Sequence, residues 1–119
     1  MSTLPPEGAR PINEIKADLF RALAHPARIR ALEVLSEGEP SVGDLQPLVG
    51  IESSHLSQQL AVLRRAGLVV TRKDGPSVIY AIRDPQLIEL LAVAKRILIT
   101  SLSETQELLA GLRAETAGA

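Results

Sequence analysis

Residues 52–82 read ESSHLSQQLAVLRRAGLVVTRKDGPSVIYAI, and this stretch decides the fold of the chain. Its first half predicts an α-helix, because Leu56, Leu60 and Leu63 recur at spacings that put their side chains on one helical face. Gly67 marks the end of this helix, since glycine readily adopts the left-handed conformation that follows a helix. A helix with one leucine face must pack against other parts of the chain.

The opposite face of this helix carries small polar side chains at Ser54, Ser57 and Gln58. Small side chains let a helix backbone approach base edges closely, and a glutamine can form a two-bond contact with adenine. We therefore expect these three residues, together with Gln59, to read DNA bases. The alternative is an ordinary solvated helix face, which serines and glutamines without further context would favour.

Two short strands, Leu68–Arg72 and Val78–Ile82, are predicted to follow the helix as a β-hairpin. Arg72 and Lys73 lie at its turn, where they can reach phosphates or a minor groove. Pro76 cannot donate a hydrogen bond to the strand ladder, so we expect an irregular tip. A helix-turn-helix followed by a basic hairpin is typical of a winged DNA-binding module.

Positive charge is concentrated in the same stretch, although the whole chain has a formal net charge of −1. Residues 51–83 hold five basic and two acidic side chains, a net charge of +3, whereas residues 1–50 and 84–119 each sum to −2. A polyanion is therefore expected to bind at residues 51–83. Arg64 and Arg65, at the end of the helix, are expected to contact backbone phosphates. A scatter of solvated charges is the alternative.

Three helices are predicted upstream of this stretch. The first is capped by Asn13, and one apolar stripe of it is expected to be buried, formed by Ile12, Ile15, Leu19, Phe20 and Leu23. The second starts at Pro26, whose missing N–H is harmless at the first helical position, and ends near Gly38. The third, residues 42–49, follows a capping box that starts at Ser41, and it stops at Gly50.

A long apolar helix is predicted from about Gln86 to about Arg113. Its apolar residues cover more surface than one buried stripe needs, so we expect it to pack against several partners. Burial within the same domain is the weaker alternative, because a small domain offers few surfaces that could cover such a helix. The expected homodimer interface on this helix consists of Leu87, Leu91, Ala94, Leu98 and Leu102.

Composition excludes several classes of function. The 119 residues include no Cys, which excludes disulfides, thiolate metal centres and cysteine catalysis. We expect no enzyme, because the chain has no Gly-x-Ser-x-Gly elbow, His-Glu-x-x-His helix or glycine-rich phosphate loop. No apolar run approaches the length of a membrane span, and the N-terminal pattern is not that of a signal peptide. We expect a cytoplasmic protein without a cofactor.

Together these elements predict a mainly α fold with a small β-hairpin, in the order α-α-α-α-β-β-α of a winged helix-turn-helix. One domain for DNA binding and dimerisation is expected at residues 13–113, since a chain of this length holds a single core. Residues 1–12 are predicted to form a flexible arm, and residues 114–119 a flexible tail.

The segment 14–98 resembles the ArsR/SmtB family of bacterial winged-helix repressors. The resemblance is carried by LAHPARIRALEVL at residues 23–35, by the stretch SxHLSQQLAVLRRAGLV at residues 53–69, and by a wing in which Asp-Gly precedes Tyr80. It implies a homodimer, joined by its first and last helices, that represses transcription until an inducer weakens DNA binding. For DNA contact, the resemblance implies Ser53, Ser54, His55, Ser57, Gln58, Gln59, Arg72 and Lys73. For the part of the dimer interface on the first helix, it implies Ile15 and Leu19.

The metal-site residues of that family are missing from this chain. Where metal-sensing members often carry Cys-x-Cys, this chain has Ser41 and Gly43, and no His follows Asp84. His25 is predicted to cap or pack at a helix start, and His55 to face DNA or solvent, so no metal site is expected.

The expected partners are double-stranded DNA and a second copy of the chain, with no membrane. A small-molecule inducer and repression without an inducer both stay open. The rival interpretation is a winged-helix module for protein interaction or DNA architecture without an inducer. Binding to a specific operator that is lost on changing Ser57 or Gln58 would separate a repressor from such a module.

Overall fold

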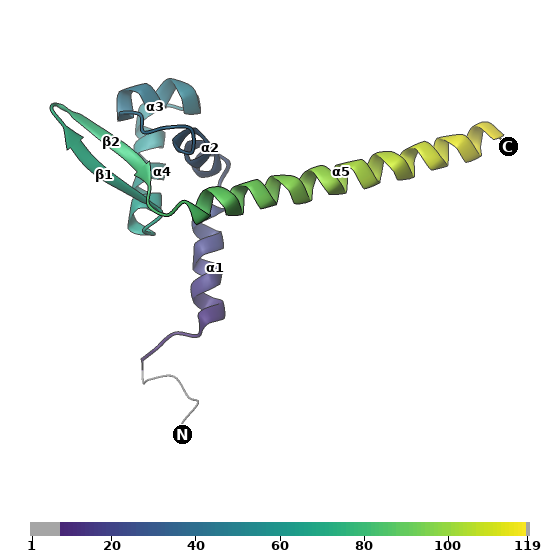
Figure 1. Ribbon diagram of the computed structural model, residues 1–119, viewed down its shortest axis with the longest axis horizontal. Helices are drawn as coiled ribbons and strands as arrows, with labels where there is room; N and C mark the ends of the chain where they lie inside the picture. The colour runs from purple at the N-terminus through teal and green to yellow at the C-terminus, as the bar shows by residue number, and fades with distance from the viewer. Residues whose placement is uncertain (1–7, 119) are drawn as a thin grey trace. The chain divides into compact units, whose positions relative to one another are not determined.

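The computed structural model describes residues 8–118, and its helices and strands follow the predicted order (Figure 1). The helices are α1 (Ile12–Leu23), α2 (Pro26–Leu35), α3 (Val42–Val49), α4 (Ser53–Arg65) and α5 (Gln86–Gly118), and the strands are β1 (Val69–Asp74) and β2 (Ser77–Ile82). Contacts divide the chain into two compact units, one ending at Asp84 and one starting at Pro85. Residues 1–7 of the predicted arm and residue 119 of the predicted tail lie outside the described residues.

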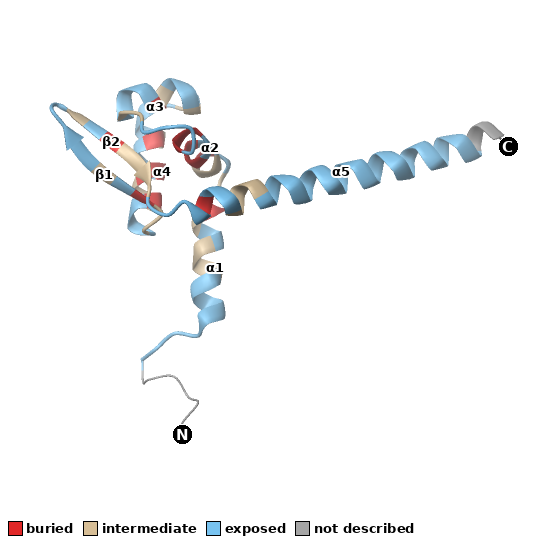
Figure 2. Cartoon of the chain, viewed as in Figure 1, coloured by how far each residue is buried: buried red, intermediate tan, exposed pale blue. Residues whose placement is uncertain are grey.

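An aliphatic core holds α2, α3, α4 and β1 together (Figure 2). Its most completely buried large side chains are Leu32, Leu45, Leu60, Leu63 and Val69. The predicted leucine face of α4 is confirmed, because Leu56, Leu60 and Leu63 are at most 2% exposed. Burial of one leucine contributes about 1.5–3 kcal/mol to stability, so these three side chains hold α4 firmly within the first unit.

Local hydrogen bonds set the ends of α2 and α3. The His25 Nδ1 accepts a hydrogen bond from the Ala27 backbone N–H at 3.0 Å, which confirms the predicted capping role of this histidine. The Ser41 hydroxyl accepts from the Asp44 N–H at 3.3 Å, and Gly50, at φ 79°, ends α3 as predicted.

The start and the surface of α1 differ from the prediction. Pro11, not Asn13, occupies the position before the helix, and no side chain caps it. Ile12 and Phe20 are 67% and 55% exposed, and Leu23 is the only buried residue of α1. The prediction of a buried stripe is therefore wrong for the single chain. Helical spacing identifies the apolar side of a helix, but it does not identify what covers that side.

The strands β1 and β2 pair antiparallel as far as Asp74 and Ser77, which leaves Gly75 and Pro76 at the tip. The predicted irregular tip is wrong, because Pro76 lies outside the ladder, where no backbone donor is needed. Gly75 adopts a φ of 61°, a conformation that glycine reaches without strain and that tight hairpin turns use.

A second connection ties the hairpin to the start of α3. Ser41 and Ile79 form an isolated antiparallel bridge, and the Tyr80 N–H donates to the Pro40 carbonyl at 3.3 Å. The segment before α3 thus lies along β2 as a short third edge. The wing is fixed to the helix-turn-helix by backbone hydrogen bonding as well as by its own connection to α4.

The helix α5 is continuous through residues 100–103 and extends to Gly118, past the predicted end at Arg113. Leu87, near the start of α5, is buried, whereas the residues of α5 from Val93 to Glu115 are exposed (Figure 2). Within residues 8–118, no helix has both the length and the apolar character that crossing a membrane requires.

Candidate nucleic-acid interface

The outward side of α4 presents a row of small polar side chains. Ser53, Ser54, Ser57 and Gln58 are all exposed. Ser54, Ser57 and Gln58 lie on the side away from the buried leucines, whereas Ser53, the first residue of the helix, has the same helical phase as Leu60. Three of the residues expected to contact DNA therefore share one accessible side of α4. Short hydroxyl side chains on such a surface leave the helix backbone free to approach a base edge.

Gln59 lies on the other side of α4, although the sequence analysis grouped it with the exposed residues. It is 9% exposed, and its Oε1 accepts a hydrogen bond from Arg28 Nη1 at 3.2 Å. The sequence spacing indicates that Gln59 lies on the buried face, because Gln59 is three residues after Leu56 and four before Leu63. The side chain is engaged in the interior and is not available on the exposed surface.

His55 is half-buried and lies against His25, which lies between α1 and α2. The two ring centroids are 5.7 Å apart, with the ring planes at 81° to one another. Because the His25 Nδ1 accepts the capping bond, the neutral His25 ring carries its proton on Nε2. Within residues 8–118, no group of three His, Cys, Asp or Glu residues is placed to hold a metal ion.

Positive side chains flank the exposed side of α4. Arg64 and Arg65 are exposed in its last turn, and Arg72 and Lys73 are exposed on β1 close to the tip of the wing. Arg72 lies 4.0 Å from Glu39, a long and exposed ion pair that leaves its charge largely free. The arrangement puts cations at two edges of a small polar surface, where a DNA backbone would pass.

Comparison with known proteins agrees with this geometry. The family model described as "Bacterial regulatory protein, arsR family" matches residues 25–71. A relative named "Uncharacterized HTH-type transcriptional regulator Rv0081", from Mycobacterium tuberculosis, is 53% identical over 107 residues, which cover 89% of this chain and 94% of the relative. The chain belongs to the arsR family of bacterial regulatory proteins. Membership of the arsR family makes the protein a DNA-binding transcriptional regulator.

One further relative and two solved structures extend the comparison. The biofilm growth-associated repressor of Xylella fastidiosa is 40% identical over 79 residues, which cover 66% of this chain and 68% of the relative. The crystal structure of M. tuberculosis Rv0081 matches with a TM-score of 0.74 and 55% identity, covering 81% of this chain and 97% of that one. A homodimeric winged helix-turn-helix DNA-binding domain, Mb0332 from Mycobacterium bovis, matches with a TM-score of 0.75 and 25% identity, covering 87% and 95%.

Two contacts beside the exposed surface of this arsR-family protein were not predicted from the sequence. Glu52 precedes α4, and its carboxylate accepts a hydrogen bond from the Ser54 hydroxyl at 2.7 Å. Arg28, from α2, reaches the buried Gln59. The first contact joins two side chains at the start of α4, and the second joins two helices that are far apart in the sequence, so helical spacing predicts neither.

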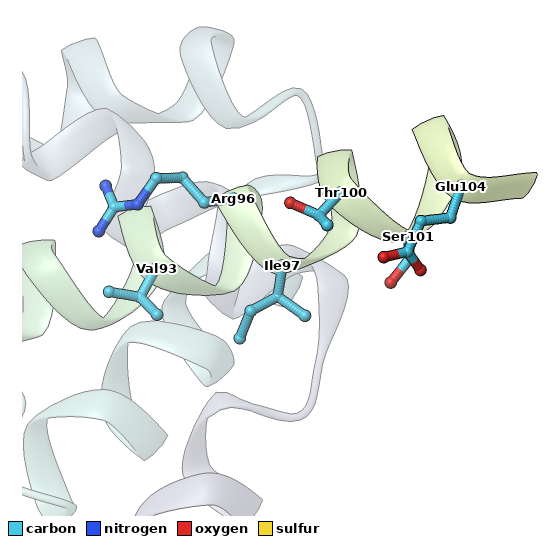
Figure 3. A pocket seen from close by; sticks show the side chains of 6 residues that line it. All are labelled: Val93, Arg96, Ile97, Thr100, Ser101 and Glu104. Atoms are coloured by element: carbon cyan, nitrogen blue, oxygen red, sulfur yellow. The ribbon is translucent and has the colours of Figure 1, made fainter. Parts of the chain in front are cut away.

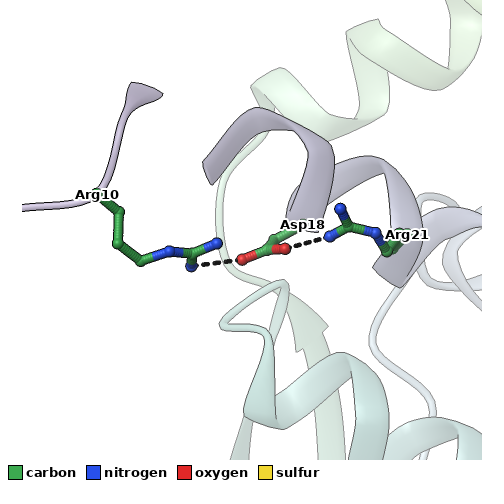
Figure 4. A network of polar contacts seen from close by, with 3 residues as sticks. All are labelled: Arg10, Asp18 and Arg21. Atoms are coloured by element: carbon green, nitrogen blue, oxygen red, sulfur yellow. Dashed lines mark hydrogen bonds and ion pairs between the residues drawn. The ribbon is translucent and has the colours of Figure 1, made fainter. Parts of the chain in front are cut away.

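The residues predicted for the dimer interface lie on α1 and α5. On α1, Ile15 is 47% exposed and Leu19 is half-buried. Near them, Asp18 accepts hydrogen bonds from Arg10, at 2.6 Å, and from Arg21 (Figure 4). On α5, Leu87 is buried, Leu91 is half-buried, and Ala94, Leu98 and Leu102 are exposed.

One side of α5 carries a shallow hollow (Figure 3). Its lining residues are Val93, Arg96, Ile97, Thr100, Ser101 and Glu104. All of them come from the same helix, and Arg96 is paired with Glu89 at 3.0 Å. A hollow along one helix encloses nothing by itself, so we assign it no ligand.

Proposed function

We propose that the protein is a homodimeric repressor that binds an imperfect palindromic operator. The observation that carries the proposal is the exposed polar surface of α4 beside a basic wing. In the proposed complex, α4 enters a major groove, with Ser57 and Gln58 near base edges. Arg64 and Arg65 approach phosphates, and Arg72 and Lys73 contact phosphates or the neighbouring minor groove.

Two observations support the dimer and the repression. The apolar sides of α1 and α5 are exposed in the single chain, which is expected of helices that a second copy covers. The named relatives include a repressor, and a structural neighbour is homodimeric. A regulator of this kind acts in the cytoplasm, where bacterial DNA lies. Release by a small-molecule inducer and repression without an inducer are both compatible with this surface.

The test is selection of binding sites from a random duplex library by the purified full-length protein. We expect an enriched imperfect palindrome whose half-sites are about 34–36 Å apart, one helical turn of DNA, because a two-fold dimer places two copies of α4 in successive major grooves. Enriched sequences without two-fold symmetry would overturn the dimeric mode of binding. A protein that enriches no sequence would fit an interaction module instead of a repressor.

A further inference from the structure

Arg28, in the first turn of α2, joins three helices of the first unit through its guanidinium group. Its Nη1 donates to Gln59 Oε1 of α4 at 3.2 Å, and its Nη2 donates to the backbone carbonyl of Arg21 in α1 at 3.3 Å. The third nitrogen, Nε, is buried without a hydrogen-bond partner among the described residues. The side chain is therefore held by groups on two helices other than its own.

The charge of Arg28 is poorly placed for α2 itself. A cation in the first turn of a helix faces the positive end of the helix dipole, and the first turn of α2 has no acidic residue. The same charge is favourable at the end of α1, where carbonyl groups carry the negative end of the dipole. There the Arg21 carbonyl also accepts from the Ala24 N–H at 3.1 Å. Arg28 thus stabilises the junction of α1 with α4.

Gln59 makes the contact at this junction directional. It is the one polar side chain classed as buried in the part of the chain that the structure describes. Leucine packing is non-directional, whereas a hydrogen bond weakens steeply when its angle changes. Successive residues of a helix point about 100° apart, so a bond that holds Gln59 inward also sets the directions of Ser57 and Gln58.

We propose that Arg28 is a positioning residue that couples the end of α1 to the rotational setting of α4, and thereby controls base discrimination. The inference rests on the proposed function, which assigns base reading to α4 and assigns part of the dimer interface to α1. A displacement of α1, by the partner copy or by an inducer, would then reach Ser57 and Gln58 through Arg28 and Gln59.

The test compares Arg28→Met, Gln59→Met and the double variant on three duplexes. These are the duplex that the wild-type protein selects from a random library, the same duplex with one selected base pair changed, and an unrelated duplex of equal length. We expect each single variant to lower the affinity ratio of the first two duplexes about fivefold, the equivalent of one hydrogen bond, with affinity for the unrelated duplex unchanged. The double variant should lose no more than either single variant.

Arg30→Met is the matched control, because it removes an exposed positive charge from the same helix. It should leave the ratio unchanged. A folded Arg28→Met variant with the wild-type ratio would overturn the inference, as would losses that simply add in the double variant. A purely structural arginine would lower the melting temperature and leave both the ratio and the selected sequence unchanged.

Arg28→Lys provides a second variant in case Arg28→Met does not fold. Lysine keeps the charge but cannot present the two-pronged donor of arginine, so an intermediate ratio is expected. A wild-type ratio in this variant would also overturn the inference. A wild-type protein that selects no sequence would overturn the proposed function itself, and that result is distinguishable because it needs no variant.

Discussion

Gln58 and Gln59 are neighbours in the sequence and have opposite surroundings in the fold. The first is exposed, and the second is 9% exposed and bonded to Arg28. The two amide groups are chemically the same, and only their positions relative to the leucines of α4 differ. At the scale of single residues, helical phase decides which glutamine is exposed and which is buried.

Gln58→Ala is expected to relax the base preference at one position of each half-site. A two-bond contact between glutamine and adenine contributes about 1–3 kcal/mol of discrimination, and alanine removes both bonds. The measurement is the affinity for the selected duplex and for variants changed at single base pairs. An unchanged preference at every position would show that Gln58 does not read bases.

Arg72→Gln and Lys73→Gln serve as the contrast to Gln58→Ala. A phosphate contact carries no sequence information, so each change should weaken binding to all duplexes alike and reduce the salt slope by about 1. Gln58→Ala should leave the salt slope unchanged. Identical behaviour of the three variants would contradict this division of roles.

Asp18 is expected to titrate below the ordinary range of an aspartate. The hydrogen bond from Arg10, followed by that from Arg21, lowers the pKa of Asp18 from its ordinary value of 3.8. Since the pKa is depressed in the folded state, the resulting stabilisation is present above pH 3.8 and is lost as the pH falls through the folded-state pKa. An NMR titration should give a pKa below 3.8 that rises in Arg10→Met. A wild-type value at or above 3.8 would contradict the contact.

At the scale of elements, the sequence predicted the parts whose cause is local. The leucine spacing of α4, the cap at Ser41 and the glycine at the end of α3 act within one or two turns, and each is confirmed. The exposed stripe of α1 and the contact from Arg28 to Gln59 depend on what lies beside a helix in space. Such contacts leave no periodic signal, because they join residues far apart in the chain.

Leu98→Asp is expected to yield monomers with weak operator binding. Leu98 is 69% exposed in the single chain, and a carboxylate placed there would lose its hydration when a second helix covered it. Sedimentation measures the oligomeric state, and titration with the selected duplex measures the affinity. Ser103→Asp adds the same charge on a different side of α5 and should remain dimeric. A dimeric Leu98→Asp variant would place the interface elsewhere.

The whole molecule leaves much apolar surface open on two of its helices. Large exposed apolar side chains occur on α1 and along α5, at Ile12, Ile15, Phe20, Ile97, Leu98, Ile99, Leu102, Leu108, Leu109 and Leu112. Patches of this kind on a small protein mark surfaces that another chain covers. The stability of the protein should therefore depend on association as well as on the core of the first unit.

The melting temperature is expected to rise with protein concentration, because association of the native form shifts the unfolding equilibrium by mass action. Calorimetry over a wide range of concentrations measures this dependence. Leu98→Asp should melt at one temperature throughout the range. A wild-type melting temperature that does not change with concentration would argue against a dimer in equilibrium with unfolded monomers.

In the proposed complex, the bridge from Ser41 to Ile79 would fix the spacing between the DNA contacts of α4 and those of the wing. Since the wing is joined to the start of α3 as well as to α4, the protein would set the distance between the bases that α4 contacts and the DNA backbone that the wing contacts. Every half-site that the protein binds would then have the same length. Inserting one base pair inside the half-site would move one contact out of reach and lower the affinity, whereas the same insertion outside the footprint would leave the affinity unchanged.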